Sequence, residues 1–225
     1  MVQIIIAAWL FGCISVWPPP SMMDGPGKGK RPSNLNIDTS NVDQELRKTL
    51  LQMLEDDQKA RANYLDWFKQ RQLQRGEQLT AADKAELEKM ASVERKNTAK
   101  LKKIVDKHGW PTIAKADYDG ASAAWFLAIY ADKDRSFQKK CLTLLKKAVD
   151  EGEANKADWA YLTDRILVAE NKLQIYGTQV KIIGQKVEPM PVQDPANLEK
   201  RRAELGMPPM SEYLERVKAQ YFNKN

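Results

Sequence analysis

Charged and amide side chains fall on helical faces that should otherwise be apolar. The apolar pattern that passes through Met53 continues, at intervals of four residues, to Asp57 and then to Arg61. Later segments place four more polar side chains on such faces, namely Asp132, Asp134, Gln138 and Arg165. Because an unpaired charge is costly to bury, we expect Asp57 and Arg61 to be mostly buried and to lie near Asp132 or Arg165.

This set of six side chains, called the polar cluster below, has two interpretations. In the first, the side chains pair with one another and fix the register of the helices, as structural ion pairs often do. In the second, they line a polar pocket whose carboxylates bind a cation or act as general acid and base, as in a hydrolase. The sequence leaves both interpretations open.

Other kinds of catalytic or metal site find few suitable residues. The only histidine, His108, ends a predicted helix beside Gly109, where the helix dipole already accounts for a basic side chain. One histidine and two cysteines are too few for a histidine-rich zinc site, and no glycine-rich phosphate-binding loop is present. Asp132 and Asp134 could offer oxygen ligands to a hard cation or could form a helix-capping turn. We therefore expect neither a cofactor nor a metal.

The charge distribution argues against a specific nucleic-acid partner. The chain has 225 residues, a formal net charge of +6 and a pI of about 9.1. Basic and acidic residues alternate along most helical segments, whereas a nucleic-acid footprint gathers the basic ones on one face. The densest basic run, TAKLKKIVDK, is typical of a solvated helix. We expect only weak, salt-sensitive binding to nucleic acid.

The first seventeen residues carry no charged side chain and precede a linker rich in proline and glycine, residues 18–41. This arrangement is typical of an exported or envelope-attached protein. The stretch LFGC resembles a lipoprotein signal, in which Cys13 would receive the lipid. An ordinary signal peptide and an uncleaved membrane anchor are the alternatives, and seventeen residues is near the short limit for a membrane span. Cys141, inside a helical pattern, is expected to be a buried hydrophobe.

The elements that must position these residues are mostly helices. Apolar periodicity and capping residues predict helices over about 42–75, 80–108, 120–130, 134–151 and 156–170, with a loop at 112–119. Two β-branched stretches about Gly184 predict a hairpin, and two helices follow it, capped by Asp194 and Ser211. We predict a mainly α, compact multi-helix domain over 42–225, with one small β-hairpin near the C-terminal third.

Several short motifs occur in a recognisable order over about residues 46–214. They are D-Q-x-x-R at 57–61, G-W-P at 109–111, A-D-x-D-x-x-F-Q at 131–138, D-R at 164–165 and Y-G-T-Q at 176–179. In this order the chain resembles a family of mostly bacterial proteins known only as a domain of unknown function. Tyr130 stands where that family usually has a histidine, which weakens any mechanism needing a histidine base there.

The resemblance implies no activity. In the Y-G-T-Q step, Gly177 would permit a sharp exit from the preceding helix, and Gln179 would satisfy backbone groups at the entry to the hairpin. The sequence therefore predicts an exported or envelope-attached helical protein that serves as a binding or structural module. The alternative is a hydrolase-like enzyme that uses the polar cluster.

Overall fold

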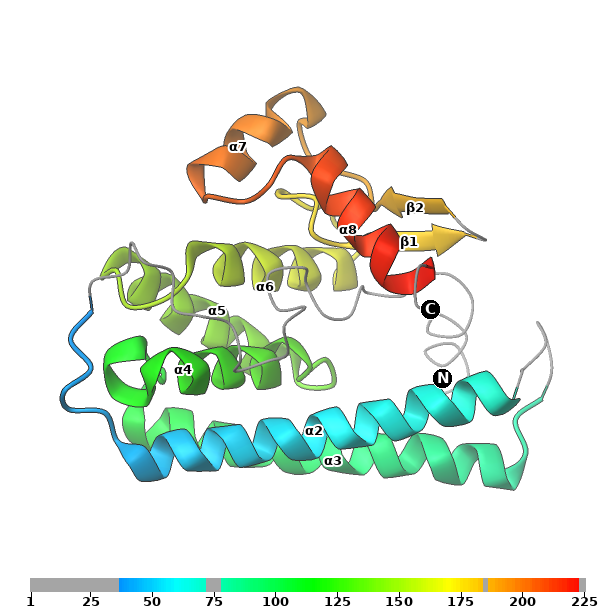
Figure 1. Ribbon diagram of the computed structural model, residues 1–225, viewed down its shortest axis with the longest axis horizontal. Helices are drawn as coiled ribbons and strands as arrows, with labels where there is room; N and C mark the ends of the chain where they lie inside the picture. Colours follow the sequence, from blue (N-terminus) through cyan, green and yellow to red (C-terminus); the bar gives the residue numbers. More distant parts are fainter. Residues whose placement is uncertain (1–36, 72–77, 184–185, 223–225) are drawn as a thin grey trace. The chain divides into compact units, whose positions relative to one another are not determined.

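A computed structural model describes residues 37–71, 78–183 and 186–222 (Figure 1). The predictions for residues 1–17, for Cys13 and for most of the linker therefore lie outside the described residues. The described chain divides into two units, an N-terminal unit of residues 37–154 and a C-terminal unit of residues 155–222. It contains seven α-helices and one two-stranded antiparallel sheet, which confirms the mainly α class.

The N-terminal unit consists of helices α2 (Gln44–Arg71), α3 (Ala81–His108), α4 (Ile113–Ile129) and α5 (Arg135–Asp150). The long helices α2 and α3 run side by side, and α4 packs against both (Figure 1). The largest apolar side chains wholly buried in this core are Leu50, Met53, Leu101, Ile113, Trp125, Phe126 and Leu145. The apolar stripe predicted for the first helix thus faces the core of this unit.

Local signals define both ends of α3. The Thr80 hydroxyl accepts a hydrogen bond from the backbone N–H of Asp83, and the Asp83 carboxylate accepts one from the N–H of Thr80. This reciprocal arrangement is the predicted capping box. At the other end, Gly109 has a φ of +71° and follows the last helical residue.

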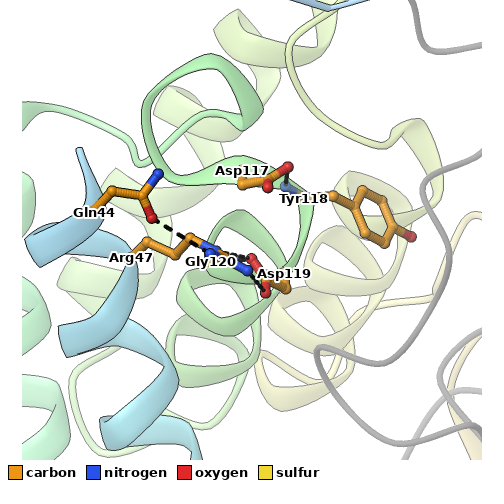
Figure 2. Close-up of polar contacts among 6 residues, drawn as sticks. All are labelled: Gln44, Arg47, Asp117, Tyr118, Asp119 and Gly120. Atoms are coloured by element: carbon orange, nitrogen blue, oxygen red, sulfur yellow. Dashed lines mark hydrogen bonds and ion pairs between the residues drawn. The ribbon is translucent and has the colours of Figure 1, made fainter. Parts of the chain in front are cut away.

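The predicted loop at 112–119 is wrong, because α4 already begins at Ile113. Burial of Ile113 and Ala116 stabilises a first helical turn, and the helix then breaks at Asp117, whose φ is +59°. Figure 2 shows how the break is held: Arg47 of α2 donates two hydrogen bonds, of 2.7 and 2.6 Å, to the carboxylate of Asp119. The Asp117 carboxylate accepts the N–H of Tyr118. The sequence D-Y-D-G therefore forms a kink rather than a loop.

The C-terminal unit contains α6 (Lys156–Ala169), β1 (Val180–Ile183), β2 (Lys186–Pro189), a 3-10 turn η2 (Pro195–Asn197), α7 (Leu198–Glu204) and α8 (Met210–Phe222). Val180 pairs with Pro189 and Ile183 with Lys186 in the predicted hairpin. Residues 160–166 of α6 are all buried, so this helix is enclosed on nearly every side. Helix α8 packs against β2.

The two helix caps predicted in the C-terminal unit have different outcomes. Asp194 occupies the N-cap position of η2 and Pro195 follows it, but the φ of Asp194 is +46° and its carboxylate accepts from the side chain of Asn197 instead of a backbone N–H. The cap predicted at Ser211 is wrong. Ser211 lies inside α8, which begins at Met210, and the N–H of Tyr213 bonds the carbonyl of Pro209. Both helices start at or next to a proline, since Pro195 is the first residue of η2 and Pro209 directly precedes α8.

Candidate functional site

Asp57 and Arg61 of the polar cluster form a buried ion pair one turn apart on α2. The Nε of Arg61 lies 2.7 Å from Oδ2 of Asp57, and its Nη2 lies 3.2 Å from Oδ1. The two residues are only 4% and 7% exposed. The guanidinium carbon also lies 3.7 Å from the ring centroid of Tyr130, a cation–π contact. Burial opposes the charge of Arg61, but Asp57 and Tyr130 hold its pKa above the ordinary value.

Gln138 joins the end of α4 to the start of α5. Its amide Nε2 lies 3.2 Å from the carbonyl of Ala128, 2.9 Å from that of Ile129 and 3.2 Å from Oδ1 of Asp132. Its Oε1 accepts a hydrogen bond from Arg135. A helix leaves its last carbonyls without partners inside the helix, and Gln138, which is wholly buried, donates to two of the last carbonyls of α4. This amide therefore has a structural task that does not require a ligand.

The two aspartates that flank this junction differ in their surroundings. Asp134 caps α5 by accepting the N–H of Phe137, and Lys102 of α3 lies 2.7 Å from its other oxygen. Lys102 is the main reason that the pKa of Asp134 is lowered to about 2, and bonds from Ser136 and Phe137 add to the effect. The Asp132 side chain remains 26% exposed and lies 3.9 Å from Arg135.

The structure thus distributes the polar cluster over both units. Within the N-terminal unit, Tyr130 links its two parts, because its ring contacts Arg61 and it directly follows Ile129, whose carbonyl Gln138 holds. Arg165 is buried in α6 of the C-terminal unit. Within residues 37–71, 78–183 and 186–222, no group of three or more His, Cys, Asp or Glu side chains could hold a metal ion.

Asp164 on α6 is a second buried carboxylate, and several backbone N–H groups donate hydrogen bonds to it. It accepts the N–H groups of Ile175 at 2.7 Å, Tyr176 at 3.1 Å and Thr178 at 2.9 Å, and the Thr178 hydroxyl at 3.0 Å. Burial raises the pKa of Asp164, although these donors oppose that shift. The Asp164-Arg165 motif therefore anchors the Y-G-T-Q turn through Asp164.

Residues that sequence reasoning missed hold the other side of this turn. Arg202 of α7 is fully buried and donates to the carbonyls of Tyr176, at 2.7 Å, and Pro208, at 2.8 Å. The Tyr213 hydroxyl of α8 donates to the carbonyl of Thr178 at 2.7 Å. No local pattern marks these two side chains, since their partners in the turn lie 26 and 35 residues away in sequence.

The role expected of the Gln179 side chain belongs instead to Gln174. The Gln174 amide accepts the N–H of Gln179 at 2.8 Å and donates to the carbonyls of Gln179 and Met190, at 2.9 and 2.7 Å. It therefore bridges the two chain segments that enter and leave the hairpin. Gly177, with a φ of +69°, provides the turn that the sequence predicted.

An open groove with a volume of about 630 Å³ lies between helices α2 and α3. Most of the residues that line it are polar, and they carry both signs of charge: Asp56, Lys59, Ala60, Asn63, Tyr64, Glu86, Lys89, Met90, Val93, Lys96 and Asn97. Asn97 at the base of the groove is buried and donates to the carbonyl of Met53, which ties α3 to α2. The groove thus offers a partner hydrogen-bonding and charged groups above a packed helix pair.

A family model matches residues 44–224. The chain belongs to the family of unknown function DUF6624. The DUF6624 match includes every helix and strand of both units, and the predicted membership of a family of unknown function is confirmed. Neither the curated proteins nor the solved structures compared with the chain gave a match. Among the described helices of this DUF6624 chain, none combines the length and the apolar character that crossing a membrane requires.

Proposed function

We propose that this DUF6624 protein is a non-catalytic binding module attached to the cell envelope, with the α2–α3 groove as its binding surface. The observation that carries the proposal is the contrast between two polar regions of the N-terminal unit. The Asp57–Arg61 pair and the Gln138 amide already hold partners within the fold. The groove, in contrast, has exposed side chains at Lys59, Asn63, Lys89 and Lys96, although Lys59 and Lys89 also pair with Glu55 and Glu86.

The chemistry of the groove favours a polar partner. Lys59, Lys89 and Lys96 contribute three positive charges, and Asp56 and Glu86 contribute two negative ones. Mixed charge of this kind supports recognition of a protein surface or another polar surface more than of a small apolar molecule. Substituting Asn63 by Trp would fill the groove from an exposed position while leaving the core untouched. We expect this variant to fold normally and to lose the ability to bind the partner in the groove.

Attachment to the envelope is supported by the uncharged residues 1–17 and the linker that follows them. The test is fractionation of cells that express the full chain, a variant lacking residues 2–17, and Cys13→Ala. We expect the full chain in the membrane fraction and the truncated chain in the soluble fraction. Release of Cys13→Ala would assign the attachment to a lipid on Cys13, whereas its retention would assign it to an uncleaved anchor. Finding Met1 on a soluble cytoplasmic protein would end this part of the proposal.

The hydrolase-like alternative is supported by one observation, the 26% exposure of the Asp132 side chain beside Gln138 and Arg135. A carboxylate at the edge of a buried network could act as a general base. Asp132→Asn separates the two functions. If Asp132 is structural, this variant binds everything that the parent binds. If the protein folds normally but loses a ligand found by screening the parent, the binding-module proposal gives way to the enzyme.

A further inference from the structure

Four lysines form a continuous stripe along the exposed side of α3. Lys96, Lys100, Lys103 and Lys107 follow one another at intervals of four, three and four residues, which places them on one face of the helix. All four are exposed. At a rise of about 1.5 Å per residue, the stripe extends over about 16 Å. We call these residues the α3 lysine stripe.

The stripe gathers four lysines that lack acidic partners on one face of a helix, whereas several other lysines of the N-terminal unit hold such partners. Lys89 pairs with Glu86, Lys102 with Asp134, and Lys140 with Asp106, each at 2.6 or 2.7 Å. In the part of the chain that the structure describes, none of the four stripe lysines has a hydrogen-bond or ion-pair partner. Their charge is therefore not neutralised within the fold, although acidic residues are abundant in the sequence.

We propose that the α3 lysine stripe is a contact surface for anionic lipid headgroups. The proposal rests on the envelope attachment proposed above, because the apolar residues 1–17 and the linker would keep the helical domain close to a bilayer. A straight row of positive charge complements a flat negative surface, and each lysine near such a surface strengthens binding about fivefold. Four lysines acting together would strengthen it several-hundred-fold at about this factor each.

The contact would be electrostatic and would leave the helix outside the hydrocarbon. The opposite face of α3 buries Ala91, Leu101 and Val105 in the core, so the helix has no apolar face with which to enter the bilayer. The stripe also lacks features that favour a polynucleotide. It contains no arginine to grip phosphate in a bidentate manner and no aromatic ring on which a base could stack. A lipid surface therefore fits the stripe better.

The test compares two variants of the full chain with equal loss of charge. The stripe variant changes Lys96, Lys100, Lys103 and Lys107 to Gln. The control variant changes four exposed lysines that hold ion pairs, namely Lys102, Lys140, Lys147 and Lys172. Glutamine has a helix propensity similar to that of lysine, and circular dichroism verifies that both variants are folded. Binding is measured by sedimentation with phosphatidylcholine vesicles that contain or lack phosphatidylglycerol.

We expect the parent and the control variant to prefer the phosphatidylglycerol vesicles by at least about tenfold, and the stripe variant to lose this preference. Insertion of the apolar N-terminus affects both vesicle types alike, so the ratio isolates the charge effect. The preference should also decline as added salt shortens the screening length below about 8 Å. The proposal is overturned if the parent shows no preference, if both variants lose it equally, or if the stripe variant keeps it while losing affinity for a single-stranded polynucleotide. Fractionation of the truncated chain tests the attachment separately, because the vesicle ratio does not depend on residues 1–17.

Discussion

Arg61 shows how a charged residue can occupy the apolar stripe of a helix. Asp57 balances its charge through two hydrogen bonds, and the ring of Tyr130 covers the guanidinium. Arg61→Ala would leave the buried Asp57 carboxylate without its partner. We expect the free energy of unfolding to fall by about 3–5 kcal/mol, a large share of the roughly 5–15 kcal/mol that stabilises a typical domain. Urea denaturation measures the change.

Lys59→Ala is the matched control for this substitution. Lys59 also pairs with an acid four residues earlier on α2, but both members of the Lys59–Glu55 pair are more than half exposed. Solvent screens such a pair, so its loss should leave the denaturation curve unchanged within error. If Arg61→Ala proves as stable as Lys59→Ala, then the Asp57–Arg61 pair does not stabilise the N-terminal unit.

Asp158 makes the stability of the C-terminal unit depend on pH. It lies in the first turn of α6, and burial raises its pKa to about 7. Because the folded protein holds this proton more tightly than the unfolded chain, the stabilisation is complete below about pH 4, the ordinary pKa of an aspartate. It is lost as the pH rises toward about 7, at about 1.4 kcal/mol per pKa unit.

Asp158→Asn removes this titration while nearly preserving the shape of the side chain. We expect the variant to be more stable than the parent at pH 8 by a few kcal/mol, about 1.4 for each unit by which the pKa is raised. At pH 4 the two proteins should have similar stability. Thermal denaturation across this range provides the measurement, and parallel curves for the parent and the variant would contradict the assignment.

At the scale of elements, the Y-G-T-Q turn depends on two features of Gly177. Its φ is +69°, a region that costs other residues about 1–2 kcal/mol, and a Cβ there would lie 3.0 Å from the sulfur of Met210. Gly206 has a similar φ of +67° but has no atom within 4 Å of such a Cβ. Gly177→Ala should therefore lower the free energy of unfolding by about 1–3 kcal/mol more than Gly206→Ala does, because the new Cβ crowds Met210. Equal losses in urea denaturation would mean that Met210 moves aside.

The sequence reveals those interactions whose partners lie within one or two helical turns. Thr80 with Asp83, Asp134 as a cap, and Asp57 with Arg61 all belong to this class. Hydrogen bonds that span longer distances along the chain leave no comparable pattern, which explains why Arg202 and Tyr213 were missed. The loop predicted at 112–119 fails for a related reason. Packing of α4 against α2 stabilises a helical turn in a segment whose composition favours a turn.

The candidate site was predictable to a similar extent. Periodicity placed Asp57, Arg61, Gln138 and Arg165 on faces that are buried, whereas Asp132 and Asp134 remain partly exposed. It could not assign partners, which depend on how helices pack. Tyr130 is the clearest case, because its ring lies over Arg61 although the two residues belong to different helical segments. The groove and the α3 lysine stripe were likewise hidden in a pattern typical of a solvated helix, since only the structure shows which lysines hold acidic partners.

At the scale of the whole molecule, Cys141 reports on the folding of the N-terminal unit, and Cys13 reports on the attachment of a lipid. Cys141 is completely buried in α5, and burial raises the pKa of its thiol to about 12. A thiol that is both inaccessible and protonated reacts slowly with a maleimide. We therefore expect Cys141 in the native protein to resist labelling and to react only after the N-terminal unit unfolds.

Mass spectrometry of protein purified from membranes would then count the reactive thiols. If Cys13 carries a lipid, the native full chain should incorporate no maleimide, and the denatured chain should incorporate one, at Cys141. If Cys13 is free and accessible, the native chain incorporates one label, and Cys13→Ser abolishes it. Arg61→Ala should speed labelling of Cys141, because a less stable N-terminal unit opens more often. Rapid labelling of Cys141 in the folded parent would contradict its enclosure in the core of that unit.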